Sequence, residues 1–375
     1  MNNYSKDRFT VLHIFSGDLW AGAEVMIFNL LDQLKDNSDL KIMALSLNEG
    51  ILTSKLRDLG VEVYSIPESI YSFPNIFLKA LTLFKRKEID LIHSHRHKEN
   101  LLAFLLAKSQ GVKRLVTTLH GMSEPSPSGQ NGRNPISLKR KMNYFILRHY
   151  FTRVVTVSRE MKRVLIQEYP FKKEKVDVIY NGIKIPKLTG QRIDQSIDHH
   201  FHIGTVGRMV PVKDFNLFLE VAAELKRQMD KVRFSILGEG PLKEQLVQRA
   251  KDLQIDDSVQ FLSPRPDPFP YYLSLDLYIN TSAHEGIPIS ILEAMACERP
   301  VVASMVGGIP EIISHGEHGL IVDTREPKKF VQQCLRIIED KKLRVTIGKN
   351  ASERIASCFS SSKMADAYRS LYYNL

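Results

Sequence analysis

The sequence is poor in cysteine and has no long apolar run. Its 375 residues include only three cysteines, Cys297, Cys334 and Cys358, which are scattered and odd in number. This pattern argues against a disulfide framework or a zinc site and favours a reducing compartment, so we expect a cytoplasmic protein. The longest wholly apolar runs, such as residues 101–107, are far too short to span a bilayer. Residues 1–10 are polar and charged, and we therefore expect no signal peptide.

Acidic residues are in the minority. The chain has 52 lysines and arginines against 42 acidic residues, and its formal net charge is +10. Such an excess implies an anionic neighbour, which could be a nucleotide, a nucleic acid or an acidic membrane surface. The sequence shows neither aromatic stacking platforms nor a known nucleic-acid-binding module, so we expect no nucleic acid partner. With 43% hydrophobic and 25% charged residues, it is typical of a globular protein large enough for two domains.

Predicted strands alternate with helices almost throughout, which indicates a parallel α/β architecture. The strands expected in the first half are 9–15, 41–47, 61–66, 89–93, 114–118, 154–158 and 176–180. Those expected in the second half are 201–206, 232–237, 259–262, 275–279 and 299–304. Residues 186–200 have low hydrophobicity and no periodicity, so we interpret them as a linker. The domains are therefore predicted at residues 1–185 and 201–362, followed by a helix within 363–375.

A stretch in the second half, residues 280–311, carries the strongest functional signal. It contains two glutamates eight residues apart, Glu285 and Glu293. Pro288 suits the first turn of a helix, and Gly286 allows a tight turn before it. A loop followed by a helix N-terminus suits an anion such as phosphate, and carboxylates accept paired hydrogen bonds from vicinal hydroxyls. The pattern therefore suits a sugar and a ribose on either side of a phosphate, although surface glutamates on an ordinary helix are the simpler alternative.

Two other loops carry candidate phosphate-binding groups. Gly207, Arg208 and Lys213 follow the strand predicted at 201–206. The two cations could contact a diphosphate and offset its charge as it leaves, or they could be solvated surface residues. Gly22 lies in a small-residue loop between the first strand and a helix, which is where doubly wound folds bind phosphates. That second motif is weak, because the full dinucleotide glycine pattern is missing.

Histidines gather at the ends of two predicted strands. His93, His95 and His97 alternate at the end of strand 89–93. No acidic or thiol partner is spaced to complete a metal site, so we prefer histidines facing a ligand-binding cleft over metal ligands. His120 follows strand 114–118, where a side chain points into the ligand crevice of a parallel sheet. The alternative is a loop histidine bonded to backbone.

Residues 137–173 combine cations with aromatic side chains. Lys139, Arg140 and Lys141 begin a predicted helix within 137–150, and further cations follow it. Tyr144, Phe145, Tyr150 and Phe151 are interleaved with these cations. The segment could be an ordinary helix with a solvated basic face. It could also dock on an anionic membrane surface, because each cation near an anionic leaflet adds about 1 kcal/mol and aromatic groups add interfacial anchoring.

The stretch E-G-I-P, L-E-A-M-A-C, P-V-V-A and G-G-I-P-E at residues 285–311 resembles the signature of the family 4 retaining glycosyltransferases. The resemblance implies the GT-B fold, with two Rossmann-like domains facing each other across a cleft and a last helix that packs on the first domain. The chain departs from the family at three positions, one of which is Lys184 where the family usually has aspartate. It has Glu298 and Ala21 where the family has glycine, and a helix end at Glu298 would strain the turn.

This resemblance assigns roles to the candidate residues. Glu293 would hold the ribose of a nucleotide sugar, Glu285 would hold its sugar hydroxyls, and His120 would lie beside the donor sugar. No metal or other cofactor is expected, because Arg208, Lys213 and backbone N–H groups would stabilise the departing diphosphate. The expected catalytic residues are Glu285, His120, Arg208 and Lys213. The expected donor-binding residues are Gly22, Gly207, Arg208, Lys213, Glu285, Gly286, Ile287, Pro288, Ile289 and Glu293.

The function implied is transfer of a sugar, with retention of anomeric configuration, from a UDP-, GDP- or ADP-sugar to a hydroxyl of a glycan or lipid-linked acceptor. The setting we expect is the synthesis of a cell-surface polysaccharide or glycolipid, with the protein peripheral on the inner face of the plasma membrane. Two alternatives remain open. A UDP-amino-sugar epimerase shares the two-domain shape but lacks the paired glutamates, and an inactive relative would not need Arg208 and Lys213.

Overall fold

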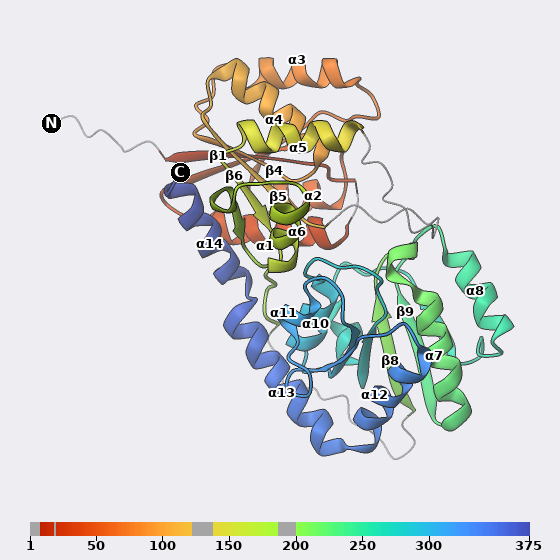
Figure 1. Ribbon diagram of the computed structural model, residues 1–375. Coiled ribbons are helices and arrows are strands. Elements are labelled where there is room, and N and C mark those ends of the chain that lie inside the picture. Colours follow the sequence, from red (N-terminus) through yellow and green to blue (C-terminus); the bar gives the residue numbers. More distant parts are fainter. Residues whose placement is uncertain (1–7, 19, 122–137, 187–199) are drawn as a thin grey trace. The chain divides into compact units, whose positions relative to one another are not determined.

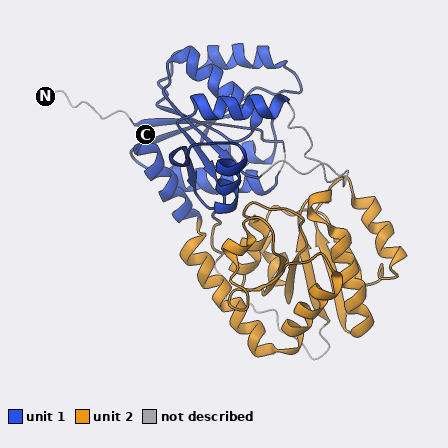
Figure 2. Ribbon diagram, in the orientation of Figure 1, with its two compact units in different colours: residues 1–122, 128–182, 361–375 blue, residues 123–127, 183–360 orange. Residues whose placement is uncertain are grey.

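The structure is a computed structural model that describes residues 8–18, 20–121, 138–186 and 200–375. The chain divides into two compact units (Figure 2). Unit 1 comprises residues 1–122, 128–182 and 361–375, and unit 2 comprises residues 123–127 and 183–360. Most of the predicted linker lies outside the described residues. The C-terminal segment belongs to unit 1, although it follows unit 2 in the sequence.

Unit 1 is built on a parallel sheet with seven described strands (Figure 1). The strands are β1 (Phe9–Phe15), β2 (Leu40–Ser46), β3 (Glu62–Ser65), β4 (Leu91–Ser94), β5 (Arg114–Leu119), β6 (Arg153–Thr156) and β7 (Val176–Val178). Their order across the sheet is β3-β2-β1-β4-β5-β6-β7. The central strands are buried on both faces, as parallel sheets require, which explains their nearly continuous apolar sequences.

Helices cover both faces of this sheet. They are α1 (Gly22–Leu34), α2 (Ile51–Asp58), α3 (Phe73–Phe84), α4 (His97–Gln110), α5 (Leu138–Tyr150), α6 (Arg159–Glu168) and α14 (Ser361–Tyr373). Helices α1, α2 and α14 pack together on one face, and α3, α4 and α5 pack on the other (Figure 1). Helix α14 packs on α1, so residues 361–373 complete this side of unit 1.

Unit 2 repeats this design with a parallel sheet in the order β10-β9-β8-β11-β12-β13. Its strands are β8 (Phe201–Val206), β9 (Val232–Leu237), β10 (Val259–Leu262), β11 (Leu277–Asn280), β12 (Val301–Ser304) and β13 (Leu320–Val322). Its helices are α7 (Phe215–Gln228), α8 (Lys243–Asp252), α9 (Phe269–Leu273), α10 (Ile289–Ala296), α11 (Ile309–Ile312), α12 (Pro327–Glu339) and α13 (Lys341–Cys358). Helix α12 packs on α7, and α13 packs on α10. The hydrophobic core of unit 2 includes the buried side chains of Phe218, Phe234 and Phe330.

Strand order reverses once in each sheet. The reversal lies between β1 and β4 in unit 1 and between β8 and β11 in unit 2. Loops that follow two such strands diverge to opposite faces and leave a crevice at the carboxyl edge, where doubly wound proteins bind ligands. In unit 2 these loops contain residues 207–213 and 281–288, and in unit 1 they contain residues 16–21 and 95–96.

The α/β prediction is confirmed, and each predicted strand is present to within a few residues. Two local differences have physical reasons. Pro288 caps α10 with an extended backbone (ψ 118°) instead of occupying the first turn, which begins at Ile289. Strand β13 was not predicted, because three apolar residues at a sheet edge give little signal. The strained turn predicted at Glu298 is confirmed, since this residue has φ 58°.

Candidate functional site

The loops after β8 and β11 are tied to each other at the reversal point of unit 2. The hydroxyl of Thr281 donates hydrogen bonds to the carbonyls of Lys213 and Asp214, at 3.2 and 2.9 Å. The amide of Ala283 donates to the carbonyl of Val212 at 2.8 Å. These hydrogen bonds fix the two predicted loops against one another, so that their side chains converge.

A salt bridge joins the two loops directly. Lys213 Nζ lies 2.6 Å from Glu285 Oε1, and the Ser282 hydroxyl donates to the same oxygen at 2.6 Å. The lysine and glutamate side chains are only 21% and 11% exposed, so solvent screens this pair less than a surface pair. Both bonds engage Oε1, and among the described residues Oε2 of Glu285 has no hydrogen-bond partner. One carboxylate oxygen is therefore held by the protein while the other is available to a ligand.

Arg325, which sequence reasoning missed, supports both loops from the segment between β13 and α12. Its guanidinium donates to the carbonyls of Thr281 and Ser282, at 2.7 and 2.9 Å, and pairs with the carboxylate of Asp214. Asp214 in turn caps α7 by accepting from the amide of Leu217. No local motif marks Arg325, because its partners lie at least 21 residues away in the sequence. It is a supporting residue for the Glu285 loop.

Glu293 lies on α10, as predicted, and is 8% exposed. Its Oε2 accepts a hydrogen bond of 2.8 Å from the hydroxyl of Tyr272, a residue that sequence analysis did not identify. Burial raises the pKa of Glu293 to about 7, and the bond from Tyr272 only partly offsets this effect. The second oxygen, Oε1, has no hydrogen-bond partner among the described residues, so Glu293 can still accept from another hydroxyl.

Glycines let neighbouring turns approach these loops. A Cβ on Gly307 would lie 1.8 Å from the carbonyl oxygen of Glu285, and this glycine also has φ 54°. A Cβ on Gly238 would lie 1.9 Å from the carbonyl oxygen of Gly207. The amide of Gly308 completes the contact by donating to the carbonyl of Gly286 at 3.0 Å. The turns at Gly238 and at Gly307–Gly308 therefore pack directly against the backbone of Gly207 and of residues 285–286.

The remaining predicted residues of unit 2 divide into buried and exposed groups. Ile287, Pro288 and Ile289 are buried at the start of α10 and shape the backbone rather than presenting side chains to solvent. Arg208 is exposed, and its side chain makes no hydrogen bond or ion pair with any residue that the structure describes. It is thus the cation of this loop that is free to meet an anion.

At the reversal point of unit 1, Gly22 begins α1 and is exposed. The cap residue is Ala21, whose amide donates to the side chain of Glu24 at 3.3 Å. Glu24 is 1% exposed and pairs with Arg96 from the loop after β4. Burial raises the pKa of Glu24, and Arg96 opposes that effect. The alanine that replaces the family's first glycine is accommodated as a helix cap with an extended backbone.

The predicted histidines separate in the structure. His93 and His95 are buried, whereas His97 is exposed at the first residue of α4. His13 of β1 takes the place we had expected for His97, because the parallel register sets it beside His93. The ligand nitrogens of His13, His93 and His95 lie within 4.8 Å of one another. Both His93 nitrogens already bond Tyr372 and Thr118, so a metal ion could bind here only if those bonds broke.

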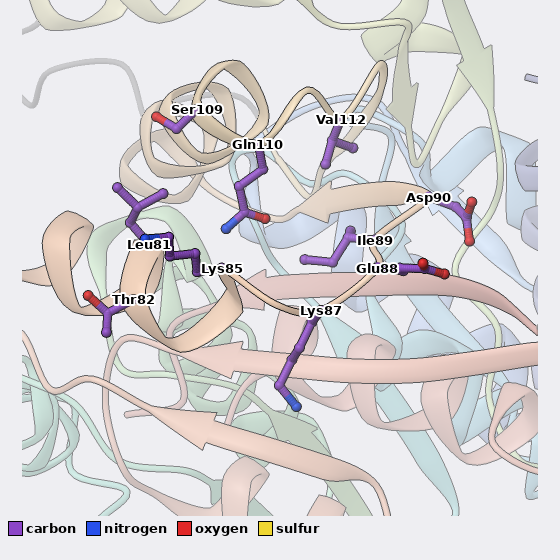
Figure 3. Close-up of a pocket in the computed structure, with 10 residues that line it drawn as sticks. All are labelled: Leu81, Thr82, Lys85, Lys87, Glu88, Ile89, Asp90, Ser109, Gln110 and Val112. Carbon is purple, nitrogen blue, oxygen red and sulfur yellow. The ribbon is translucent and has the colours of Figure 1, made fainter.

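A hollow of about 710 Å³ lies elsewhere on unit 1 (Figure 3). It is lined by α3, the segment before β4 and the end of α4, including Leu81, Lys85, Asp90 and Gln110. These residues precede β4 and β5 or lie on the adjoining helices, so the hollow is at the amino edge of the strands. It contains none of the candidate residues, and the carboxyl edge remains the place where they gather.

Two family models match the chain. Residues 20–186 match the model described as Glycosyltransferase Family 4, and residues 192–354 match the model described as Glycosyl transferases group 1. Among curated relatives, the N-acetyl-alpha-D-glucosaminyl L-malate synthase of Bacillus anthracis is 26% identical over 82% of this chain and 81% of its own length. The UDP-Gal:alpha-D-GlcNAc-diphosphoundecaprenol alpha-1,3-galactosyltransferase of Escherichia coli is 25% identical over 92% of this chain and 91% of its own.

The solved structures agree on the fold. Anabaena HepE in complex with UDP-glucose superposes with a TM-score of 0.84 at 21% identity, covering 98% of this chain and 100% of that protein. Both family models and the curated relatives describe glycosyltransferases, and the parallel sheets of the two units have the layout of the GT-B fold. The chain therefore belongs to the family 4 glycosyltransferases, and it is a glycosyltransferase with the GT-B fold.

Proposed function

We propose that this protein transfers a sugar from a UDP-sugar to a hydroxyl of a lipid-linked glycan, with retention of anomeric configuration, in the assembly of a cell-surface polysaccharide or glycolipid. The observation that carries the proposal is the Lys213–Glu285 pair at the strand reversal of unit 2. Such a pair places a cation for a diphosphate beside a carboxylate for sugar hydroxyls. The name of the Escherichia coli relative, with its UDP-Gal donor and undecaprenol-linked acceptor, supports the same choice of substrates.

Each side chain has a defined part in this proposal. Lys213 carries three N–H donors and uses one on Glu285, so it can bind a phosphate oxygen without releasing the glutamate. Arg208, which is free among the described residues, supplies a second charge as the diphosphate leaves. Oε2 of Glu285 would accept from the donor sugar, and Oε1 of Glu293 would accept from the ribose. These cations would stabilise the negative charge on the departing diphosphate without a metal ion.

A panel of nucleotide sugars tests the donor. We expect UDP-glucose, UDP-galactose or UDP-N-acetylglucosamine to stabilise the protein against heat by about 2.7 kcal/mol at one hundred times its dissociation constant. The same donor should be slowly hydrolysed when no acceptor is present. GDP-glucose and ADP-glucose serve as comparison ligands, because they differ from UDP-glucose only in the base. Stabilisation by GDP- or ADP-glucose alone would contradict a UDP donor, and no effect from any nucleotide sugar would contradict the transferase proposal.

The acceptor needs a separate comparison, since the Bacillus anthracis relative is named for malate, a small soluble acceptor. We expect transfer to a polyprenyl-diphosphate-linked sugar in detergent and little transfer to malate or a free monosaccharide. Product analysis by NMR would give the anomeric configuration, because the coupling between H1 and H2 differs between the two anomers. Inversion would contradict the retention that we propose.

The exposed face of α5 supports delivery of the acceptor from an anionic membrane. Leu138, Met142 and Phe145 are 81%, 48% and 53% exposed and recur at helical spacing. Lys139 and Lys141 are exposed beside them. Tyr144 and Phe151 are buried, so of the four aromatic residues considered for docking only Phe145 and Tyr150 are exposed. No helix among the described residues is long and apolar enough to cross a membrane.

Vesicle sedimentation tests this docking. We expect binding to vesicles with 30 mol% phosphatidylserine at low salt, weaker binding at high salt, and none to phosphatidylcholine alone. The double variant Lys139→Glu/Lys141→Glu should lose this binding. The matched control is Lys328→Glu/Lys329→Glu on α12, which changes charge equally at exposed lysines of unit 2. Equal binding to both vesicle types, or equal loss in both double variants, would reject docking through α5.

A further inference from the structure

Three imidazole rings form a continuous chain inside unit 1. His13 Nδ1 lies 3.2 Å from His95 Nε2, and His95 Nδ1 lies 3.2 Å from His120 Nε2. The rings are stacked in sequence, with interplanar angles of 17° and 27°. Three strands provide them: His13 is in β1, and His95 and His120 directly follow β4 and β5. The chain therefore runs from the buried centre of the sheet to its carboxyl edge.

His93 belongs to a separate set of bonds that leaves this chain intact. Its Nδ1 contacts the hydroxyl of Tyr372 at 2.7 Å, and its Nε2 contacts the hydroxyl of Thr118 at 2.8 Å. The His93 ring packs on that of His95, with 4.3 Å between centroids. Burial lowers the pKa of His95 and of His93 well below the usual range, so these rings are neutral at neutral pH.

A chain of neutral imidazoles can carry its protons in only two ways. Each ring has one N–H donor and one bare acceptor, so a bond between two rings fixes both of them. In one arrangement all three rings are protonated on Nδ1, and His120 presents an N–H at its outer nitrogen. In the other all three are protonated on Nε2, and His120 presents a lone pair there.

The two ends of the chain decide between these arrangements. Nε2 of His13 and Nδ1 of His120 are the terminal nitrogens; both are buried atoms, and neither has a partner among the described residues. His13 is 0% exposed, whereas His120 is half-buried at the end of β5. A buried N–H without an acceptor is rarer in proteins than an acceptor left without a donor. Only the His120 end lies at the carboxyl edge, where a ligand could supply an acceptor, whereas His13 is enclosed within the sheet. The bare lone pair is therefore assigned to His13 and the N–H to His120.

We propose that His95 and His13 are positioning residues that hold His120 with its proton on Nδ1, so that His120 donates a hydrogen bond to an oxygen of the sugar substrate. This inference rests on the proposed function for the identity of the ligand, but not for the protonation pattern. It assigns His120 the part of a neutral donor. Action as a base would require all three protons to shift along the chain at once.

Nitrogen-15 NMR of the histidine-labelled protein without substrate tests the protonation pattern. We expect His13, His95 and His120 all to carry the proton on Nδ1, which is the less common form of a free imidazole. A proton on Nε2 of His120 in the wild-type protein would overturn the inference, whatever the protein transfers. Addition of the donor or acceptor that is turned over should shift the Nδ1–H proton of His120, and no shift would overturn its role as donor.

Variants separate positioning from simple packing. His95→Phe should return His120 to a mixture of forms and lower kcat/KM by about three- to tenfold, the value of one hydrogen bond. His13→Phe should weaken the preference of His120 for a proton on Nδ1. His13→Gln should retain that preference, because an amide N–H can donate to His95 Nε2. Tyr372→Phe removes a buried hydrogen bond in the same region but outside the chain, and His97→Ala removes a neighbouring exposed histidine. Both controls should leave the form of His120 unchanged.

The outcomes distinguish this inference from the proposed function. If a UDP-sugar is turned over but His95→Phe and Tyr372→Phe change the His120 signals equally, the inference fails and the transferase proposal stands. If His120 has the expected form but no nucleotide sugar binds, the proposed function fails, and the donor role of His120 toward a sugar fails with it.

Discussion

The two units share a strand layout, but the residues at their reversal points differ in kind. In unit 2 the loops carry charges held in pairs, Lys213 with Glu285 and Arg325 with Asp214. In unit 1 the corresponding edge is backed by a buried set of neutral rings that includes His95 and is linked by hydrogen bonds. Charged pairs suit a charged ligand such as a diphosphate, and neutral donors suit hydroxyl groups. The same topology can therefore serve two ligand chemistries through a small number of side chains.

The largest expected effect comes from removing the cation of unit 2. We expect Lys213→Ala to lower kcat by on the order of 10²–10³, with a smaller change in donor affinity, because its charge matters most as the diphosphate departs. Arg208→Ala should act in the same direction. Steady-state kinetics with the identified donor would measure both, with Lys251→Ala, an exposed lysine on α8, as control. A pure rise in KM would show that these cations only bind the ground state.

A second prediction concerns the buried carboxyl group of unit 2. Glu293→Ala should weaken donor binding by about 1–3 kcal/mol, the usual result of removing a buried hydrogen-bond partner. Glu293→Gln keeps an acceptor for the Tyr272 hydroxyl and should lose less. Isothermal calorimetry with the nucleotide sugar would give the affinities, and Glu339→Ala at an exposed position of α12 provides the control. Unchanged affinity in Glu293→Ala would remove Glu293 from the ribose site.

The two regions should respond to pH with opposite signs. Burial lowers the pKa of His13 and of His120 to about 3, so from the ordinary value near 6.5 down to that range the unfolded chain binds protons that the folded chain does not. Each such histidine therefore costs about 1.4 kcal/mol of stability per pH unit below pH 6.5. Glu293 behaves oppositely: its pKa is raised from 4.5 to about 7, so its contribution is complete below pH 4.5 and is lost as the pH rises through 7.

Hydrogen exchange at pH 7, 6 and 5 would separate these responses. Protection in peptides from β1 and β4 should fall on acidification, after correction for the intrinsic exchange rate, while protection in peptides from α10 should hold or increase. His13→Leu should flatten the response of β1 and leave that of α10 unchanged. A parallel loss of protection in both regions would contradict the opposed behaviour.

The smallest effect concerns the turn after α10. Glu298 adopts φ 58°, a left-handed conformation that costs most residues roughly 1–2 kcal/mol but costs glycine little. Glu298→Gly should stabilise the protein by about 1 kcal/mol, less the extra entropy of glycine in the unfolded chain. Chemical denaturation would measure this, with Glu353→Gly within α13 expected to destabilise instead. Any loss of stability in Glu298→Gly would show that its side chain makes a compensating contact.

The sequence allowed prediction of the features that local patterns encode. The strand series, the loop position of Glu285 and the helical position of Glu293 follow from alternation and from one motif. Arg325 and Tyr272 were missed because each reaches the site from a distant segment that has no pattern of its own. The contacts of Arg325 and Tyr272 could be identified only once the order of the strands across the sheet was known.

The histidines of unit 1 show the same limit. Their spacing in the sequence suggested that His93, His95 and His97 act together. The helix that begins at His97 removes it from the group, and the parallel register of β1 and β4 replaces it with His13. The protonation pattern of His120 depends on this replacement. It could not be inferred until two strands separated by almost eighty residues were known to be neighbours.

Helix α14 has a consequence for how the protein is made. It places Tyr368 and Tyr372 in the polar interior of unit 1, where they bond Thr118 and His93. Unit 2 is almost wholly encoded by residues 183–360, so during translation it can fold while unit 1 still lacks these tyrosines. Until the ribosome releases α14, His93 has no Tyr372 to bond and α1 has no partner helix on that side. The nascent first unit therefore leaves the surface that α14 covers exposed until α14 has been synthesised.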